Sequence, residues 1–412
     1  MNRRLFLQGT AAFAGCSAVG LTGCAKKQIA ASVAAPPSLP FPSLPFYDAV
    51  GPITPIRADV DRIFRITVCL RPFRAAGPRL EAERLGDKVV VHNYGHGGSG
   101  WSLSWGSADV VVRKALDAAN GKKELAVIGC GALGLTAAST AQRAGFKVTI
   151  YARERPPYVR SARATGAWTP DSRIALTSAA SPNFAAEWES MARTSFAMYQ
   201  SYLGMPGTPI EWADHYELFD EDRAERRSNP RPAKTHDFAH YEDRIADLTP
   251  ETQDIPEGAH PFPTKYVKRD TTLTFNVADY SRQLMNDFMI AGGTIETREF
   301  QSPQDMASLA QPVIINCTGY GARQLWSDES IVPVRGQIAW LIPQEGVHYG
   351  LYYKGVNVLG RRDGIVVQPN LGGEEEGWND TNEQPDRAAA VAGVEVIQEL
   401  YSRMAKMPKR SS

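Results

Sequence analysis

The sequence has no run of apolar residues that approaches the roughly 20 that a membrane-spanning helix needs. It has no charge excess either: Lys and Arg together number 45, as do Asp and Glu, which argues against nucleic acid as a partner. Only five cysteines occur and none forms a CxxC pair, so neither a zinc ribbon nor a redox pair is indicated. The sequence also has no GxSxG elbow, so a hydrolase has no support, and no P-loop, so a nucleoside triphosphatase has none either.

The first residues are typical of an export signal. In residues 1–24, Arg3 and Arg4 precede a short Ala/Gly-rich apolar run, which resembles the twin-arginine signals of bacteria. The run ends in LTGC, a lipobox-like pattern that makes Cys24 a candidate lipid anchor and predicts an exported, periplasmic or otherwise extracytoplasmic protein. An ordinary secretory signal or a helical hairpin of the domain is the alternative. Residues 25–58, rich in Ala, Pro and Ser, are expected to form an extended linker.

A dinucleotide-binding unit is predicted over residues 124–154. An apolar strand leads into GCGALG, a helical stretch follows, and a second strand begins after a glycine. In such a unit the first glycine permits the turn, the second lets a pyrophosphate approach the backbone, and the third allows close packing of helix and strand. The residues expected to bind the dinucleotide are Gly129, Gly131, Ala132, Leu133 and Gly134.

The end of the second strand indicates which dinucleotide is bound. Glu154 lies about 20 residues past the last glycine, where an acid would bind the ribose hydroxyls. Arg153, its neighbour, would instead suit a 2′-phosphate. FAD, NAD and NADP therefore all remain open from this segment.

A second strand, glycine loop and helix is predicted over residues 89–121. Three valines precede a glycine-rich stretch, and a helical pattern starts near Trp101. Such a loop aims backbone N–H groups and a helix N-terminus at a developing anion, and a reduced flavin carries one on its pyrimidine edge. The alternative is a plain turn in which His92 and His96 are structural or surface residues.

The same segment carries a resemblance to a known family. HNYGHGGSGWSLSWGSA, residues 92–108, closely resembles the signature of D-amino-acid oxidases. Four more segments resemble parts of the family: CLRPFRAAGPRLEAE (69–83), ARATGAWTPD (162–171), INCTGYGA (315–322) and VRGQI (334–338). The resemblance covers most of residues 60–400 and implies an α/β (mixed α+β) fold, in which a Rossmann-like FAD-binding domain is interlaced with a mixed-sheet substrate domain.

The order of these segments departs from the family, in which the GxGxxG strand opens the chain and the histidine-glycine signature closes it. Here the arginine strand and the signature come first, which predicts a circular permutation with an unpermuted three-dimensional fold. The FAD half is expected to comprise residues 86–168 and 264–330, and the substrate half residues 59–85, 172–263 and 331–404.

The resemblance implies a carboxylate clamp on the arginine strand. It places Arg74, the second arginine of LRPFR, on the substrate carboxylate, since a guanidinium binds a carboxylate bidentately. Arg71, Arg79 and Arg84 are the local alternatives.

The family also has a pair of lid tyrosines at the substrate. The resemblance places Tyr353 on the first, but the second falls on Asn357, so Tyr349 or Tyr352 would have to compensate. The substrate-binding residues implied are thus Arg74, Tyr353, Asn357 and Gly98.

The contacts with the flavin and its pyrophosphate follow from the same resemblance. Ser161 keeps a hydroxyl where the family has a threonine pair, whereas Arg153 replaces an acidic residue and leaves the ribose to Glu154. The other flavin contacts implied are Gly97, Gly98, Gly100, Trp101, Ser102, Ala167, Trp168 and Thr169.

The activity that the resemblance implies is oxidative deamination of D-amino acids by hydride transfer from Cα to the flavin, giving a 2-oxo acid, ammonia and hydrogen peroxide. Three alternatives stay open: an oxidase of glycine, sarcosine or another amine, a dehydrogenase that passes electrons to a quinone, and a non-catalytic flavin-bound lipoprotein, which Asn357 favours.

His236 and His240 have helical spacing, but no HExxH glutamate accompanies them, so no metal site is predicted. The sequence leaves the oligomeric state open.

Overall fold

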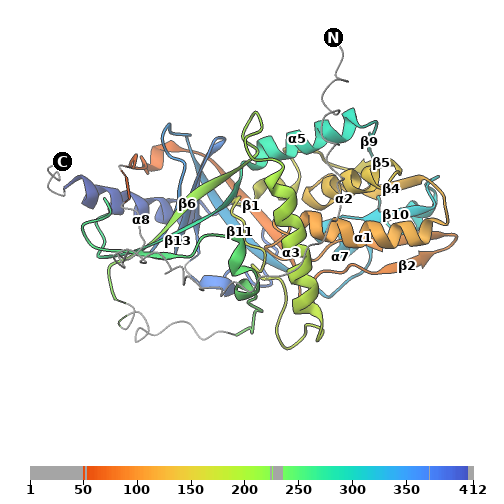
Figure 1. The fold of residues 1–412 in the computed structure, drawn as a ribbon, viewed down its shortest axis with the longest axis horizontal. Helices are drawn as coiled ribbons and strands as arrows, with labels where there is room; N and C mark the ends of the chain where they lie inside the picture. Colours follow the sequence, from red (N-terminus) through yellow and green to blue (C-terminus); the bar gives the residue numbers. More distant parts are fainter. Residues whose placement is uncertain (1–49, 52, 223–224, 226–234, 371, 407–412) are drawn as a thin grey trace, which may run out of the picture. The chain divides into compact units, whose positions relative to one another are not determined.

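The computed structural model describes residues 50–406, apart from 52, 223–224, 226–234 and 371. The predicted export signal and lipid anchor, and most of the linker, lie outside the described residues. The described residues belong to one compact unit, in which the described strands build one six-stranded and one eight-stranded sheet (Figure 1). No helix in the described part combines the length and the hydropathy that a membrane crossing requires.

The six-stranded sheet is mostly parallel and has the order β2-β3-β10-β4-β5-β9. Its inner strands are short apolar runs buried on both faces, the pattern expected of parallel strands covered by helices. Only β2 is antiparallel to its neighbour. The bounds are β2 Ala82–Leu85, β3 Lys88–His92, β10 Val313–Asn316, β4 Glu124–Ile128, β5 Lys147–Ala152 and β9 Thr294–Thr297.

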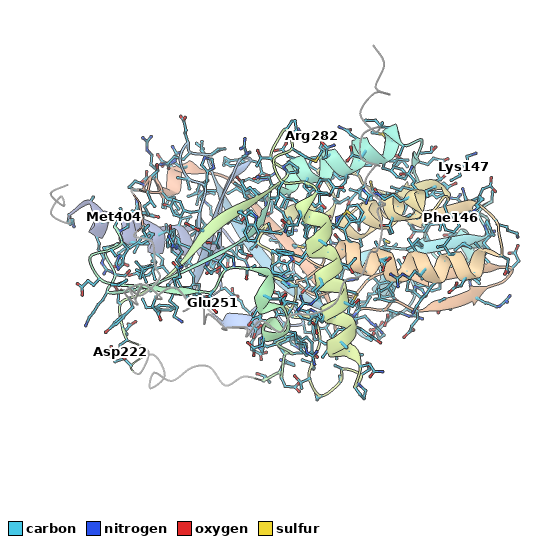
Figure 2. All side chains as sticks on the ribbon, viewed as in Figure 1. Phe146, Lys147, Asp222, Glu251, Arg282 and Met404 are labelled. Atoms are coloured by element: carbon cyan, nitrogen blue, oxygen red, sulfur yellow. The ribbon has the colours of Figure 1, made fainter. Side chains whose placement is uncertain are left out.

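Helices cover both faces of this sheet. On one face lie α1 and α2, whose small buried residues let the two helices approach closely, and α5 and α3 pack outside them. The exposed Arg282 (Figure 2) marks the outer side of α5. The short α6 and α7 contribute Met306 and Leu325 to the other face. The bounds are α1 Ser104–Ala119, α2 Ala132–Arg143, α3 Phe184–Gln200, α5 Val277–Ile290, α6 Pro303–Ala307 and α7 Ala322–Leu325.

The eight-stranded sheet is mixed, with the order β1-β11-β14-β13-β12-β6-β8-β7. Its pairs are antiparallel except β12 with β6. One face packs on α8 (Arg387–Ala405), whose N-cap Asp386 accepts a hydrogen bond from the Ala389 N–H at 3.0 Å. The bounds are β1 Ile63–Arg74, β11 Ile331–Leu341, β14 Gly364–Pro369, β13 Val356–Arg361, β12 Gly350–Tyr353, β6 Ile210–Phe219, β8 Tyr266–Phe275 and β7 Gln253–Ile255.

The predicted mixed α/β fold class is confirmed, and two of the predicted boundaries need correction. Residues 82–85, expected in the substrate half, form β2 and pair with β3 in the six-stranded sheet. Residues 266–275, expected in the FAD half, form β8 and pair with β6 in the eight-stranded sheet. The chain passes from α1, which ends at Ala119, to β4, which begins at Glu124, through a short link. The circular permutation itself stays a prediction.

Candidate active site

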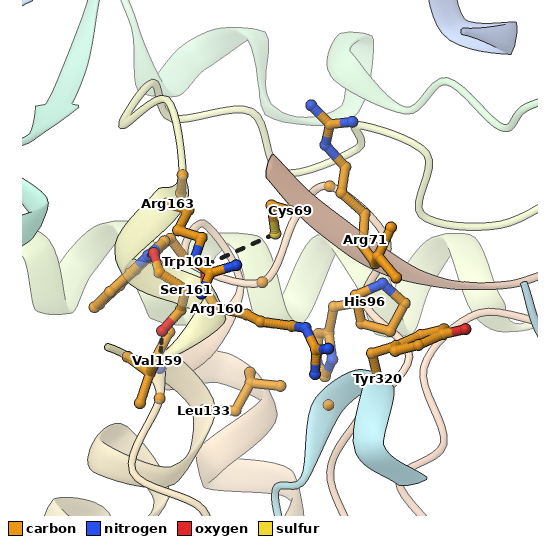
Figure 3. A pocket seen from close by; sticks show the side chains of 18 of the residues that line it. Cys69, Arg71, His96, Trp101, Leu133, Val159, Arg160, Ser161, Arg163 and Tyr320 are labelled. Atoms are coloured by element: carbon orange, nitrogen blue, oxygen red, sulfur yellow. Dashed lines mark hydrogen bonds between the residues drawn. The ribbon is translucent and has the colours of Figure 1, made fainter. Parts of the chain in front are cut away.

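A cavity lies where the loops at the carboxyl ends of β3, β4, β5 and β10 face strands β1, β11 and β13 of the other sheet (Figure 3). Its volume is about 640 Å³, within the range of ~300–1,000 Å³ usual for small-molecule sites. Open α/β sheets bind ligands at the carboxyl ends of their strands. The position and the size of the cavity therefore both indicate a binding site.

Close backbone packing shapes one end of this cavity. Gly129 directly follows β4 with φ +109°, and a Cβ added there would lie 2.5 Å from the carbonyl oxygen of Cys317. A Cβ on Gly134 would lie only 2.0 Å from the carbonyl oxygen of Gly129. Only glycine fits at either position, as the dinucleotide interpretation requires.

The N-terminus of α2 faces the same end. Its N-cap, Gly131, offers no side-chain cap, and Gly131, Ala132 and Leu133 line the cavity. The Ala132 N–H donates to the Ser161 hydroxyl at 3.1 Å, which joins the predicted pyrophosphate residues. Uncapped N–H groups and the positive end of the helix dipole are suited to phosphate.

The same end also contains Arg153 and Glu154, the two residues that left the choice between FAD, NAD and NADP open. Arg153 and Glu154 both line the cavity, and the Arg153 guanidinium lies 3.7 Å from Glu154 Oε1 and 3.1 Å from Glu299 Oε1. Hydrogen bonding to Glu299 raises the pKa of Arg153. Two carboxylates thus already neutralise the cation that a 2′-phosphate would need, which favours a dinucleotide with a free ribose hydroxyl.

The second glycine loop also lines the cavity. Gly97 has φ +54°, and a Cβ there would lie 1.9 Å from the carbonyl oxygen of Arg173. The Gly98 N–H donates to the carbonyl of Ser172 at 2.9 Å, and the Trp101 indole N–H donates to the carbonyl of Ser161 at 2.8 Å. The loop is therefore tied to the segment around Ser161 and Arg173.

Most of the predicted cofactor- and substrate-binding residues line this one cavity, and four do not. Gly134 packs behind the loop, and Trp168 packs in the helical core against Phe196. Arg74 and Tyr353 also lie away from the cavity. The residues that line it are Gly97, Gly98, Gly100, Trp101, Ser102, Gly129, Gly131, Ala132, Leu133, Arg153, Glu154, Ser161, Ala167, Thr169 and Asn357.

The position of the arginine clamp needs correction. The Arg74 guanidinium donates to the Ser330 hydroxyl (2.8 Å) and the Gly77 carbonyl (3.1 Å), and lies 3.6 Å from Asp328 Oδ2. Arg71 lines the cavity instead, and no carboxylate of the described residues lies within 4.0 Å of its guanidinium. Side chains alternate along a strand, so residues three apart on β1 point to opposite faces. That alternation could have shown from the sequence that only one of the two arginines reaches the cavity.

Arg71 is half-buried, and no carboxylate of the described residues forms an ion pair with it. Desolvation lowers the pKa of Arg71, and among the described residues its guanidinium donates one hydrogen bond, from Nη1 to the Arg335 carbonyl at 3.3 Å. Gly336 lies beside it, and a Cβ there would lie 2.4 Å from the guanidinium and displace it. A desolvated guanidinium on a cavity wall is suited to bind an anion that enters the cavity.

The placement of Tyr353 is corrected as well. Its buried hydroxyl donates to Asp220 Oδ2 at 2.8 Å and accepts from Arg403 Nη1 at 2.6 Å. Tyr353 pairs with Val356 across the β12–β13 hairpin, whereas Asn357 pairs with Tyr352. Cross-strand partners share a face, so Tyr353 faces the core under α8 while Asn357 faces the cavity.

Two charged residues at the cavity, Arg173 and Asp171, were not named as site residues from the sequence. Arg173 holds a left-handed conformation, φ +49°, and donates through Nε to the Glu374 carbonyl at 2.8 Å. Burial, and then the charge of Arg71, lowers its pKa to about 10. Burial raises the pKa of Asp171 to about 6, and His240 Nδ1 lies 3.9 Å from its carboxylate. Asp171 and Arg173 lie at the end of the ATGAWTPD segment or just beyond it, which was the available signal.

The two histidines with helical spacing do not converge. His236 Nδ1 lies 2.5 Å from Glu375 Oε2, whereas ligand atoms of His240, Asp171 and Glu242 lie within 4.8 Å of one another on the cavity wall. His240 and Glu242 are exposed, and exposed groups of this kind are common without a metal. The cluster by itself therefore does not indicate a metal ion.

Comparison with known families agrees with this geometry. Residues 124–408 match the family model described as FAD dependent oxidoreductase (DAO). The chain belongs to this DAO family. FAD is the cofactor of the family, and the NAD and NADP alternatives are set aside.

Curated relatives of this oxidoreductase include two bacterial enzymes named D-amino-acid oxidase. One, from Streptomyces coelicolor, is 28% identical over 65% of this chain and 75% of its own length. The other, from Rubrobacter xylanophilus, is 30% identical over 52% of this chain and 57% of its own length. The matched region thus spans little more than half of that second relative.

Solved structures include an iminodiacetate oxidase from Chelativorans sp., with a TM-score of 0.43 at 14% identity, covering 68% of this chain and 80% of that one. An L-amino acid deaminase from Proteus vulgaris gives 0.44 at 12% identity, covering 68% of this chain and 75% of that one. The family assignment rests on the sequence match rather than on these low scores.

The cavity of this DAO-family protein fits FAD. The glycine cradle and the α2 N-terminus would hold the pyrophosphate with Ser161, and Glu154 would face the ribose. The histidine-glycine loop would hold the flavin end. Arg71 then lies on the remaining wall, where a substrate would enter the same cavity.

Proposed function

We propose that this protein oxidises D-amino acids with FAD, and that Arg71 binds the substrate carboxylate. The observation that supports this most is a half-buried guanidinium, without a described carboxylate within 4.0 Å, on the wall of the cavity that holds the dinucleotide loop. Arg173, a buried guanidinium, adds positive potential beside Arg71. Both relatives described above are named D-amino-acid oxidase, which agrees with the proposal.

The residues of the chain itself would bind and orient the substrate. Arg71 would dock the carboxylate bidentately, and the Gly98 backbone and Asn357 line the space in which the rest of the substrate would lie. When bound, FAD supplies the acceptor for the hydride that leaves Cα, and its reoxidation by oxygen yields hydrogen peroxide. The substrate becomes an imino acid, which water hydrolyses to a 2-oxo acid and ammonia.

A spectroscopic experiment tests the proposal. The visible spectrum of the protein without residues 1–24 is recorded, D- and L-amino acids are added in the absence of oxygen, and air is then admitted. We expect D-isomers to bleach the flavin band and air to restore it with release of peroxide. Bleaching only by glycine, sarcosine or another amine, or by no amine at all, would contradict the proposal. Reoxidation by a quinone but not by air would replace the oxidase with a dehydrogenase.

We further propose that the protein is exported and that Cys24 carries a lipid. The support is the arginine pair and the LTGC sequence of residues 1–24. Cell fractionation of the full chain and of a Cys24→Ser variant tests both parts. We expect the full chain in the membrane fraction and the variant in the soluble extracytoplasmic fraction. Retention of both in the cytoplasm would contradict the proposal.

A further inference from the structure

His96 is a buried polar side chain on the cavity wall that the proposed function does not use. It lies in the histidine-glycine loop between Gly95 and Gly97, both with positive φ, and its exposure is 1%. Its backbone is fixed by a bridge to Phe73 of β1 and by its carbonyl, which accepts from the Ser99 N–H at 2.9 Å. Figure 3 shows its ring among the side chains that line the cavity.

Neither ring nitrogen of His96 has a hydrogen-bond partner among the described residues. His92 of the same motif differs at one nitrogen: its Nδ1 lies 3.1 Å from the Asn316 amide nitrogen, whereas its Nε2, 3.4 Å from Glu83, has no hydrogen-bond partner among the described residues. Burial lowers the pKa of His96 to about 3, so the ring is neutral at pH 7. A neutral imidazole has one N–H donor and one acceptor nitrogen, and leaving both buried and unbonded costs stability.

The surroundings of His96 indicate what would satisfy it. The loop that holds it is joined through Trp101 and Ser161 to the N-terminus of α2, where the pyrophosphate of FAD would bind. Arg71 supplies the charge that binds a substrate carboxylate, and the neutral ring of His96 would add little to that binding. The ring system of FAD has an edge with both N–H and carbonyl groups, which matches a neutral imidazole.

We propose that His96 is a cofactor-binding residue, with one ring nitrogen hydrogen-bonded to FAD. His96 therefore lowers the stability of the FAD-free protein, because the cost of burying its ring nitrogens is compensated only when FAD is bound. This inference rests on FAD binding and not on the identity of the substrate.

The test compares three variants of the full chain. His96→Leu removes both polar atoms, His96→Asn places an amide near the position of Nδ1, and His96→Gln places one near Nε2. His348→Leu is the control, since His348 is exposed and does not line the cavity. The readouts are the FAD dissociation constant, the visible spectrum of bound FAD, and the thermal midpoint with and without FAD.

We expect His96→Leu to raise the FAD dissociation constant about tenfold. The same variant should raise the midpoint of the FAD-free protein by about 1–3 °C, because the unsatisfied atoms are gone. Either His96→Asn or His96→Gln should bind FAD within about threefold of the unmodified protein, and the other should resemble His96→Leu. The control should change neither quantity.

Two results would overturn the proposal. One is an unchanged FAD dissociation constant in His96→Leu, which would leave His96 a structural residue or one bonded to water. If His96→Leu does not fold, the two amide variants decide instead: equal FAD affinities in His96→Asn and His96→Gln would mean that no ring nitrogen faces FAD.

Discussion

The two ends of the cavity are built differently. The dinucleotide end is made of backbone: glycines that admit no Cβ and a helix N-terminus without a side-chain cap. The substrate end is made of side chains from distant segments, with Arg71 from β1, Arg173 from the loop before α3 and Asn357 from β13. The first depends on a short stretch of chain, whereas the second exists only when strands far apart in sequence pair. Substitutions at the dinucleotide end should therefore lower FAD affinity, whereas substitutions at the substrate end should lower kcat/KM and leave FAD bound.

The largest effect is expected at the backbone end. Gly134→Val forces a Cβ to within 2.0 Å of the Gly129 carbonyl, so the helix must move off the strand. We expect at least about a 100-fold loss of FAD affinity, since such overpacking costs about 3 kcal/mol or more. Equilibrium dialysis with FAD measures this. Gly51→Val is the matched control, because a Cβ there meets nothing within 4 Å. Normal FAD binding by Gly134→Val would show that this end is not a rigid backbone cradle.

The next effect separates the two arginines of β1. Arg71→Ala should lower kcat/KM about 100- to 1,000-fold and leave FAD bound, because the lost contact is a charged hydrogen bond to the substrate. Arg74→Ala should lower the free energy of unfolding by about 1 kcal/mol and change kcat/KM less than about threefold, since Arg74 bonds only to protein groups. Steady-state kinetics and denaturant titration measure both variants. A large loss of kcat/KM in Arg74→Ala with a small one in Arg71→Ala would identify Arg74 as the clamp. Loss of FAD from Arg71→Ala would show that Arg71 also supports the dinucleotide end.

A smaller effect concerns how His96 responds to pH in the FAD-free protein. Burial holds the pKa of His96 at about 3 in the folded chain, below its ordinary value, so the unfolded chain binds the proton first as pH falls. The stability that the neutral ring allows is present above pH ~6.5 and is lost as pH falls. Between pH 7 and pH 5 the unmodified protein should lose about 2 kcal/mol relative to His96→Leu. Urea titrations at the two pH values measure it, and parallel curves for the two proteins would show that the ring is not buried and neutral.

The contrast between the two ends also explains what the sequence could predict. The GxGxxG unit and the glycine loop were located correctly because strand, turn and helix follow one another within about 30 residues. Arg71 was named only as an alternative to Arg74, because nothing local in LRPFR says which face of β1 meets the cavity; that depends on pairing with β11, some 260 residues away. Arg173 was missed for a similar reason, since only the close approach of Gly97 to its carbonyl brings it to the cavity. The boundary errors at β2 and β8 likewise concern which sheet a strand joins, and pairing partners decide that.

The smallest effect tests the two faces of the β12–β13 hairpin. Tyr353→Phe removes a hydroxyl that bonds Asp220 and Arg403, so it should lower the free energy of unfolding by about 1 kcal/mol and leave kcat/KM within about twofold. Asn357→Ala should do the opposite, changing kcat/KM about three- to tenfold, by different factors for different D-amino acids, with little effect on stability. Kinetics across a substrate panel and denaturant titration measure both variants. If Tyr353→Phe altered the ranking of substrates, this tyrosine would act as the lid that the family resemblance implies, and the hairpin would have to turn its other face toward the cavity when substrate binds.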